Sequence, residues 1–238
     1  MSQGTRRVAE QVDEVLAETG AQKVNIIAHS MGGVDSRYLI STLGYGDRVA
    51  SLTTISSPHR GSGIADIALN LTPRAADGAM NALLEAVGRT FSEEADEANL
   101  RAALEGIAEK NMPAFNEANP DDERVYYQSW AGISAVTGFA NGDAAEHCEQ
   151  KLLLHDGTYD HMDALLWAMV PFVAGVSVDP NDGMSTVASA KWGEFQGCIP
   201  ADHLDEVGQL DGEPDLDTGF DHIRFYRNIA YDLAERGF

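Results

Sequence analysis

The clearest chemical signal in this sequence is a serine held between small residues. Ser30 stands in the run Ala-His-Ser-Met-Gly at 28–32, after a short apolar segment at 24–28 and before a helical pattern. A strand, a tight turn and a helix in this order form a nucleophile elbow, which needs small residues two positions before and after the serine. We therefore predict that the Ser30 hydroxyl is a nucleophile and that the Met31 N–H, at the helix N-terminus, receives an oxyanion. The alternative is that Ser30 only caps the helix.

A serine nucleophile needs a base that takes its proton and a carboxylate that orients this base. Where the nucleophile sits on an elbow, the acid and then the histidine follow it along the chain. Of the seven histidines, His29 and His59 come too early, and His222 opens the last predicted helix. His203 stands late, in a loop-like segment at 200–206. We predict that His203 is the base.

Two aspartates between the serine and this histidine could supply the carboxylate. Asp179 and Asp182 both lie in the segment Val-Asp-Pro-Asn-Asp-Gly-Met at 178–184, which follows an apolar stretch. Asn-Asp-Gly is also a favourable turn sequence, so it does not by itself mark a catalytic group. The residue types alone leave both aspartates open.

The elements that must position these groups follow from the periodicity of the apolar residues. Apolar residues recur at helical spacing over 5–19, and Gly20 follows as a helix-stop signal. Apolar, β-rich runs at 24–28 and 49–56 flank a helix predicted from about 31 to 42. Strand, helix and strand joined by short links are typical of a parallel sheet, so we predict an α/β fold with helices flanking a mostly parallel sheet.

The remaining segments complete one expected domain over 1–238. Residues 62–117 are rich in Ala, Glu, Leu and Asn at helical spacing, so we predict a helical insertion outside the sheet. We further predict a strand at 124–133, a loop-like region at 137–158, a helix at 160–172 and an amphipathic helix at 222–237.

Acidic residues dominate the composition, with Asp+Glu 38 against Lys+Arg 16 and a net charge of −22. This charge repels phosphate groups, so we expect neither nucleic acid nor an anionic membrane as a partner. The longest uncharged apolar run, at 164–178, is broken by Pro171 and Gly175 and is too short to span a bilayer. No apolar stretch follows Arg6 and Arg7, so we expect no export signal in the chain as given.

Four segments, in order and approximate spacing, resemble the secreted bacterial triacylglycerol lipases of the Pseudomonas and Burkholderia type, which are α/β-hydrolases. They lie at 24–33, 57–62, 181–183 and 203–209, and the likeness runs from about residue 5 to the C-terminus. The resemblance implies Ser30 as nucleophile and His203 as general base and acid. It also implies that Asp182, rather than Asp179, is the orienting carboxylate.

The resemblance further implies a carboxylic ester hydrolase, specifically a triacylglycerol lipase that forms an acyl-enzyme on a lipid substrate. Two alternatives are an esterase or thioesterase for short soluble acyl chains, and a non-catalytic lipase remnant that binds calcium. The insertion at 62–117 would be a lid that opens at a lipid interface. The protein would be secreted.

Such lipases hold one structural Ca²⁺ near the catalytic histidine. By resemblance, Asp205 and Gln209 match two of its ligands, and Asp160 fits an upstream aspartate ligand. The backbone carbonyl of Glu213 fits the fourth position. Oxygen atoms of these kinds are what a hard cation prefers.

The chain also departs from these lipases in two ways. Their second cysteine follows the Asn-Asp-Gly segment closely, whereas Cys198 stands just before the His203 loop, so we expect a Cys148–Cys198 disulfide at a changed position. They carry several strands and a His-Gly oxyanion loop before the elbow strand, but only 23 residues precede Val24 here. We expect the N-terminal strands and the second oxyanion donor to be missing from this chain.

Overall fold

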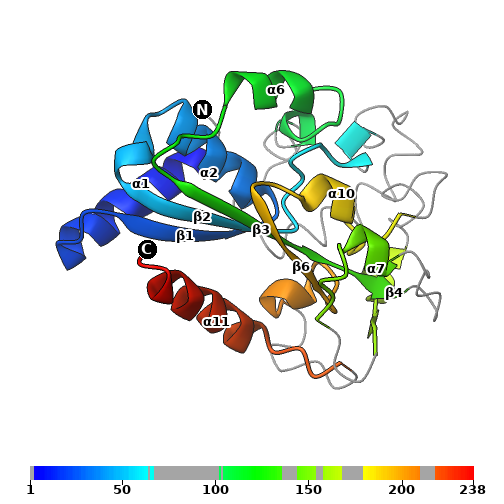
Figure 1. The fold of residues 1–238 in the computed structure, drawn as a ribbon. Helices are drawn as coiled ribbons and strands as arrows, with labels where there is room; N and C mark the ends of the chain where they lie inside the picture. Colours follow the sequence, from blue (N-terminus) through cyan, green and yellow to red (C-terminus); the bar gives the residue numbers. More distant parts are fainter. Residues whose placement is uncertain are drawn as a thin grey trace.

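A four-stranded parallel sheet forms the centre of the protein (Figure 1). The computed structural model describes residues 3–63, 65–66, 102, 104–135, 144–153, 158–167, 179–209 and 218–238. The strands lie in the order β1-β2-β3-β6, with bounds Val24–His29, Val49–Ile55, Tyr126–Gly132 and Glu194–Ile199. Each neighbouring pair is parallel, as the strand–helix–strand pattern predicts. The predicted α/β class is confirmed.

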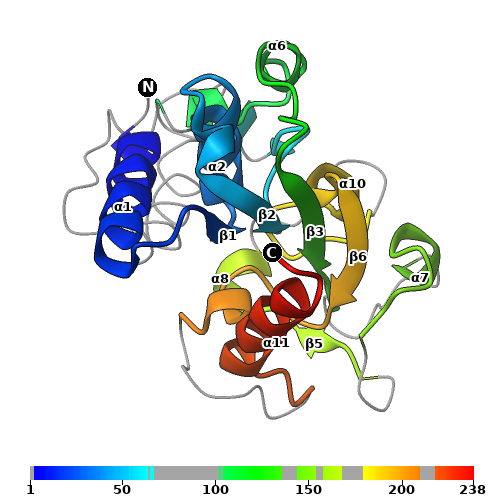
Figure 2. The ribbon, with the colours of Figure 1, turned by 60° about the vertical axis from the view of Figure 1, so that its left-hand side comes forward.

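Helices cover both faces of this sheet (Figure 2). α1 (Gln3–Thr19) packs against α2 (Met31–Ser41) on one face, and α11 (His222–Glu235) lies on the other. The N-terminus of α11 is capped by Asp221, whose carboxylate accepts a hydrogen bond from the Arg224 N–H. None of the described helices is long and apolar enough to cross a membrane.

The alternation of side chains along the strands divides the core between the two faces. Ile27 and Ile55 pack with the apolar side of α11, which includes Ile229. Leu52, on the opposite side of β2, packs with Ile40 of α2. Helices thus pack on both faces of the sheet and fix the position of its carboxyl edge, where the strands end.

A disulfide between Cys148 and Cys198 attaches a loop to the outer strand β6. Cys148 directly follows the short helix α7 (Ala144–His147), and both sulfur atoms lie in a buried apolar cluster. The expected 148–198 pairing is present in the structure. Strand β6 itself is absent from the sequence-based expectations, because Gln196 and the left-handed Gly197 interrupt its apolar pattern.

Two other expectations differ from the structure. The region 137–158, expected to be loop-like, contains α7 among its described residues. The helix expected at 160–172 begins later, because β5 (Asp160–His161) pairs with β4 (Ser134–Ala135) and α8 covers only Ala164–Trp167. The Asp160 carboxylate accepts a hydrogen bond of 2.6 Å from the Ser134 hydroxyl, which fixes the extended conformation there. Residues 168–172 lie outside the described part of the chain.

The insertion at 62–117 lies mostly outside the described residues, but both of its ends are placed. The Ser62 N–H donates to the Ile107 carbonyl at 3.0 Å, and the Glu109 N–H donates to the Asp66 carboxylate at 2.8 Å. The two ends of the insertion therefore lie next to each other. The remaining short elements are η1 (Tyr45–Asp47), α6 (Met112–Ala118), α10 (Val187–Ala190) and η2 (Asp205–Val207).

The disulfide yields a prediction about stability. Its cysteines are 50 positions apart, so the bridge removes much conformational entropy from the unfolded chain. Replacing both Cys148 and Cys198 by Ala should lower the free energy of unfolding by about 2–4 kcal/mol, measured by urea denaturation. Reduction of the unmodified protein should act in the same direction. An unchanged denaturation midpoint in both experiments would contradict the prediction.

Candidate active site

The backbone at Ser30 makes a sharp turn between the end of β1 and the start of α2. Ser30 has φ 54° and ψ −135°, in a region that residues other than glycine rarely adopt. Its N–H donates to the Ile55 carbonyl at 2.9 Å, which fixes the turn against β2. Its side chain forms no capping hydrogen bond with α2. The structure therefore does not support the alternative that Ser30 is an ordinary helix cap.

The hydroxyl of Ser30 points instead to His203. His203 Nε2 lies 2.8 Å from Ser30 Oγ, and His203 Nδ1 lies 2.7 Å from Asp182 Oδ2. Both partners of the serine are buried, with Asp182 at 0% and His203 at 6% exposure. Three segments that are far apart in the sequence thus meet in one hydrogen-bonded line above the carboxyl edge of the sheet.

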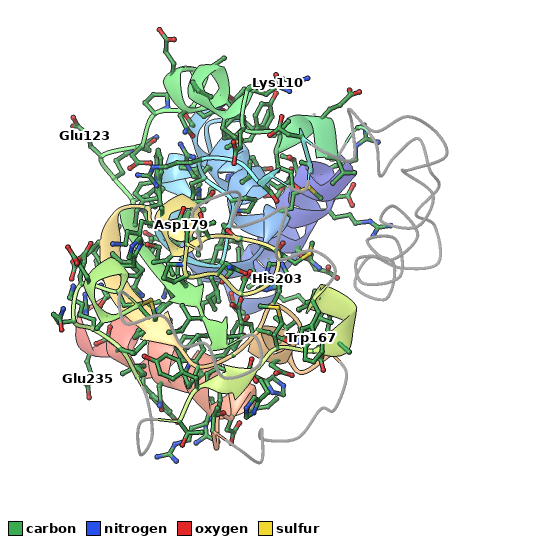
Figure 3. The ribbon with its side chains drawn as sticks, turned by 90° about the vertical axis from the view of Figure 1, so that its right-hand side faces the viewer. Lys110, Glu123, Trp167, Asp179, His203 and Glu235 are labelled. Atoms are coloured by element: carbon green, nitrogen blue, oxygen red, sulfur yellow. A yellow bond between two sulfur atoms is a disulfide. The ribbon has the colours of Figure 1, made fainter. Side chains whose placement is uncertain are left out.

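Asp182 is the carboxylate that contacts the histidine, and its neighbours stabilise its negative charge. Burial by itself would raise the pKa of Asp182, but His203 and the N–H groups of Ser185 and Met184 hold this pKa below its usual value. The backbone carbonyl of Asp179 accepts a hydrogen bond from the Asn181 side chain, and Asp179 lies apart from His203 in Figure 3. The geometry therefore places Asp182, rather than Asp179, behind the imidazole.

Close packing of α2 on the strands depends on Gly33 more than on Gly32. A Cβ at Gly33 would overlap Ser57 Oγ and would lie 2.8 Å from Thr54 Cγ2. A Cβ at Gly32 would meet only Ala28 Cβ, at an ordinary 3.8 Å. A side chain at Gly32, the second position after the serine, would therefore have room. Gly33 is the glycine that lets the elbow helix approach the sheet.

One group near the site was not predicted from the sequence. Glu206 is fully buried, lies 3.0 Å from His29 Nε2 and accepts a hydrogen bond of 2.6 Å from the Ser56 hydroxyl. Burial and the nearby charge of Asp182 raise the pKa of Glu206 well above its usual value. The sequence signal was weak, because Glu206 is one more acid beside Asp205 in an acid-rich chain.

An acidic cluster lies beside the His203 loop. Oxygen atoms of Asp160, Asp202 and Asp205 lie within 4.8 Å of one another. Asp160 and Asp205 belong to the calcium ligands expected from the sequence, whereas Asp202 does not. Burial raises the pKa of Asp202, although backbone N–H groups, including that of Asp163, oppose this shift. Gln209 follows on the same loop, and Glu213 lies outside the described residues.

The line Ser30–His203–Asp182 can perform nucleophilic chemistry. His203 can take the proton of the serine hydroxyl through Nε2, while Asp182 fixes Nδ1 and stabilises the resulting imidazolium. Met31 is the first residue of α2, so its N–H belongs to the end of the helix where anions are stabilised. This combination of groups is suited to acyl transfer.

Comparison with known families agrees with the fold. The family model for the alpha/beta hydrolase fold matches residues 3–165, more than half of the chain. The chain belongs to the α/β-hydrolase fold family. The match includes the elbow at Ser30, whereas Asp182 and His203 lie after its end.

Relatives within this family carry lipase names. The chain is 29% identical to triacylglycerol lipase 2 of Saccharomyces cerevisiae, with 98% of this chain and 63% of the yeast protein covered. It is 28% identical to a triacylglycerol lipase of Vibrio cholerae, with 95% and 71% covered. A 33% identity to a triacylglycerol lipase of Burkholderia plantarii covers 57% of this chain and 36% of that protein. The chain thus spans less than two thirds of the yeast and Burkholderia relatives.

Solved structures show the same fold at low sequence identity. The mature Bacillus licheniformis lipase BlEst2 superposes with a TM-score of 0.58 at 18% identity, covering 84% of this chain and 66% of that one. The Staphylococcus hyicus lipase superposes with a TM-score of 0.56 at 17% identity, covering 89% and 69%. These likenesses establish the architecture.

The packing of the elbow helix in this hydrolase fold yields a second prediction. Gly33→Ala should lower the free energy of unfolding by about 1–3 kcal/mol, because its Cβ would force α2 away from β2. Gly32→Ala is the matched control and should be neutral or stabilising, since alanine favours helices. Thermal denaturation of the two variants provides the measurement. Equal effects of the two substitutions would contradict the packing argument.

Proposed function

We propose that this protein is a carboxylic ester hydrolase, and specifically a triacylglycerol lipase. The observation that carries the proposal is the hydrogen-bonded line from Ser30 through His203 to Asp182. The lipase names of the yeast and Vibrio relatives supply the substrate class. This chain aligns with 63% of the yeast protein and 71% of the Vibrio protein.

In the proposed reaction, the Ser30 oxygen attacks the carbonyl carbon of the ester while its proton passes to His203 Nε2. The Met31 N–H stabilises the oxyanion of the tetrahedral intermediate. Collapse of this intermediate breaks the bond to the alcohol, which leaves with the proton from His203, and an acyl-serine forms. A water molecule, deprotonated by His203, then attacks the acyl-serine and releases the fatty acid and the free serine.

The insertion at 62–117 is proposed to act as a lid over this site. Both of its ends are tied together through Ser62 and Ile107, and the Ser62 hydroxyl also donates to the Met184 carbonyl at 3.0 Å. The insertion therefore emerges next to the loop that carries Asp182. A lid of this kind would contact a lipid interface and open the site to the lipid substrate there.

A calcium ion is the proposed structural cofactor. Asp160 and Asp205 from the expected ligand set come together with Asp202, and both Asp160 and Asp202 are buried. Carboxylate oxygens are the ligands that a hard cation prefers, and a cation between these groups would relieve their mutual repulsion, so this donor set fits Ca²⁺. When bound, the ion would neutralise these charges and fix the loop on which His203 lies. Gln209 and the carbonyl of Glu213 remain the proposed additional ligands.

Secretion is proposed together with this function. The Cys148–Cys198 disulfide joins two buried segments, and disulfides persist mainly in oxidising compartments outside the cytosol. The named lipases of Vibrio and Burkholderia are bacterial relatives. A culture fractionated into cells and medium, probed with an antibody against this chain, tests the proposal.

The triad assignment yields the third prediction. Ser30→Ala should abolish hydrolysis, and Asp182→Asn should lower kcat by about 10³–10⁴-fold, because the histidine loses its orienting charge. Asp179→Asn is the matched control and should keep most of the activity. Hydrolysis of tributyrin and of long-chain triglycerides, with fluorophosphonate labelling of Ser30, provides the measurement.

Each result of this experiment separates the alternatives. Hydrolysis of long triglycerides at an interface supports a lipase, whereas activity on tributyrin alone indicates an esterase for short chains. No labelling of Ser30 indicates a non-catalytic protein. Activity in Ser30→Ala, or equal losses at Asp179 and Asp182, would contradict the assignment.

The calcium site yields the fourth prediction. Chelation with EGTA should lower the melting temperature, because the loop at 202–209 loses the cation that neutralises its carboxylates. Asp205→Ala should melt at the lower temperature with or without EGTA. Glu235→Ala, at the exposed end of α11 (Figure 3), is the control and should respond to EGTA like the unmodified protein. An unchanged melting curve of the unmodified protein in EGTA would remove the site.

A further inference from the structure

We propose that Glu206 is a positioning residue, which fastens the loop carrying His203 to the carboxyl ends of β1, β2 and β3. The proposal rests on the proposed hydrolase function, because it concerns the placement of the base. The Glu206 carboxyl lies next to Ser56 and His29, whereas the Ser30 hydroxyl is bonded to His203. It acts through the groups that it holds.

The carboxyl of Glu206 occupies a cradle built from two strand ends. A Cβ at Gly132, the last residue of β3, would overlap Glu206 Oε1, so only glycine leaves room for this carboxyl. Ser56, the first residue after β2, donates from its hydroxyl to the same oxygen at 2.6 Å. The Gly132 N–H in turn donates to Ser56 Oγ at 2.9 Å. One carboxyl oxygen is thus bonded to Ser56, and the Ser56 hydroxyl is in turn bonded to the end of β3.

The backbone of Ser56, like that of Ser30, has a positive φ. Its φ is 47°, which is unfavourable for a residue with a side chain. Ser56 is also almost fully buried. Strain of this kind persists where the surrounding structure enforces it, and here the enforced conformation aims the hydroxyl at Glu206.

The other carboxyl oxygen faces the strand that carries the nucleophile. His29, the last residue of β1, has its Nε2 at 3.0 Å from Glu206 Oε2. Neither atom forms a hydrogen bond within the described residues, so the pair is a close polar contact between two buried atoms. The His29 ring lies against the His203 ring, with 4.4 Å between their centroids. Glu206 therefore connects the residue before the nucleophile with the loop of the base.

The turn between Asp202 and Glu206 transmits this anchoring to His203. The Glu206 N–H donates to the Asp202 carbonyl at 3.0 Å. The N–H groups of Leu204 and Asp205 donate to the Asp202 carboxylate at 2.9 and 3.0 Å. His203 lies inside this closed turn, so a shift of Glu206 moves the imidazole as well. Displacement of a reacting group by about 1 Å can cost on the order of 10²-fold in rate.

The deciding variants change the carboxyl without changing its volume much. Glu206→Leu removes both contacts and should lower kcat by about 10–100-fold, with KM within about twofold of the unmodified value. Glu206→Gln should recover most of the loss. Its amide oxygen can accept from Ser56, and its NH₂ group can donate to His29. A residue that only fills space would show neither the kcat effect at constant KM nor this recovery.

The experiment measures ester hydrolysis and the rate of fluorophosphonate labelling of Ser30 in the full chain, normalised to titrated active sites. Unmodified protein that neither hydrolyses esters nor reacts with the probe would overturn both the proposed function and this inference. Active unmodified protein together with an equally fast Glu206→Leu variant would overturn the inference alone. Equal losses in Glu206→Leu and Glu206→Gln would also overturn it.

A gentler pair of variants covers the case in which Glu206→Leu does not fold. Ser56→Ala removes only the hydroxyl that binds Glu206 and should lower kcat by about 5–10-fold, again with little change in KM. Ser36→Ala is the matched control, because the buried Ser36 hydroxyl bonds only to the Gly32 carbonyl within α2. Equal kcat values in these two variants would overturn the inference.

Discussion

The structure depends on a line of backbone hydrogen bonds that crosses the carboxyl ends of the strands. In each step, a residue just after one strand donates to the carbonyl of the next strand. The bonds run from Ser30 to Ile55, from Ser56 to Trp130 and from Ile133 to Ile199. A further bond, from the Ser134 N–H to the Asn181 carbonyl at 3.1 Å, extends the line to the acid loop. The proposed nucleophile and the loop of the proposed acid are thus placed by one continuous scaffold. The unfavourable backbone of Ser30 is a cost of order 1–3 kcal/mol that this scaffold offsets.

The electrostatics of the site separate two buried carboxyls into different states. Asp182 accepts hydrogen bonds from two backbone N–H groups and contacts His203, so its pKa is lowered despite burial. For Glu206, burial and then the nearby Asp182 charge raise the pKa, and the Ser56 hydrogen bond opposes this only in part. Of these two carboxyls, Asp182 is therefore the one that carries the negative charge, which in the proposed mechanism stabilises an imidazolium at His203. The large net charge of the chain plays no part in this distinction, because it depends on local contacts.

The features that could be predicted from the sequence are those set by local spacing and chain order. The elbow at Ser30 needs a strand, small residues and a helix within ten positions, so its pattern is complete in one segment. The chain order of serine, acid and histidine reduces the candidates for the base to one histidine, His203. The choice of Asp182 over Asp179 came from family resemblance alone, since both aspartates have similar sequence surroundings. Strand β6 was missed, because Gly197 and Gln196 remove the apolar alternation by which strands are recognised.

Glu206 shows why the rest of the site could not be predicted. Its partner Ser56 is 150 positions away, and no local pattern connects a serine after one strand with an acid in a late loop. The two meet only because the sheet order places the ends of β2 and β3 beneath the His203 loop. Side-chain type gives no help either, since a buried position is ordinarily expected to be apolar. Residues that touch the reacting groups can be recognised by their chemistry, whereas residues that hold those groups are defined by tertiary contacts and require the fold.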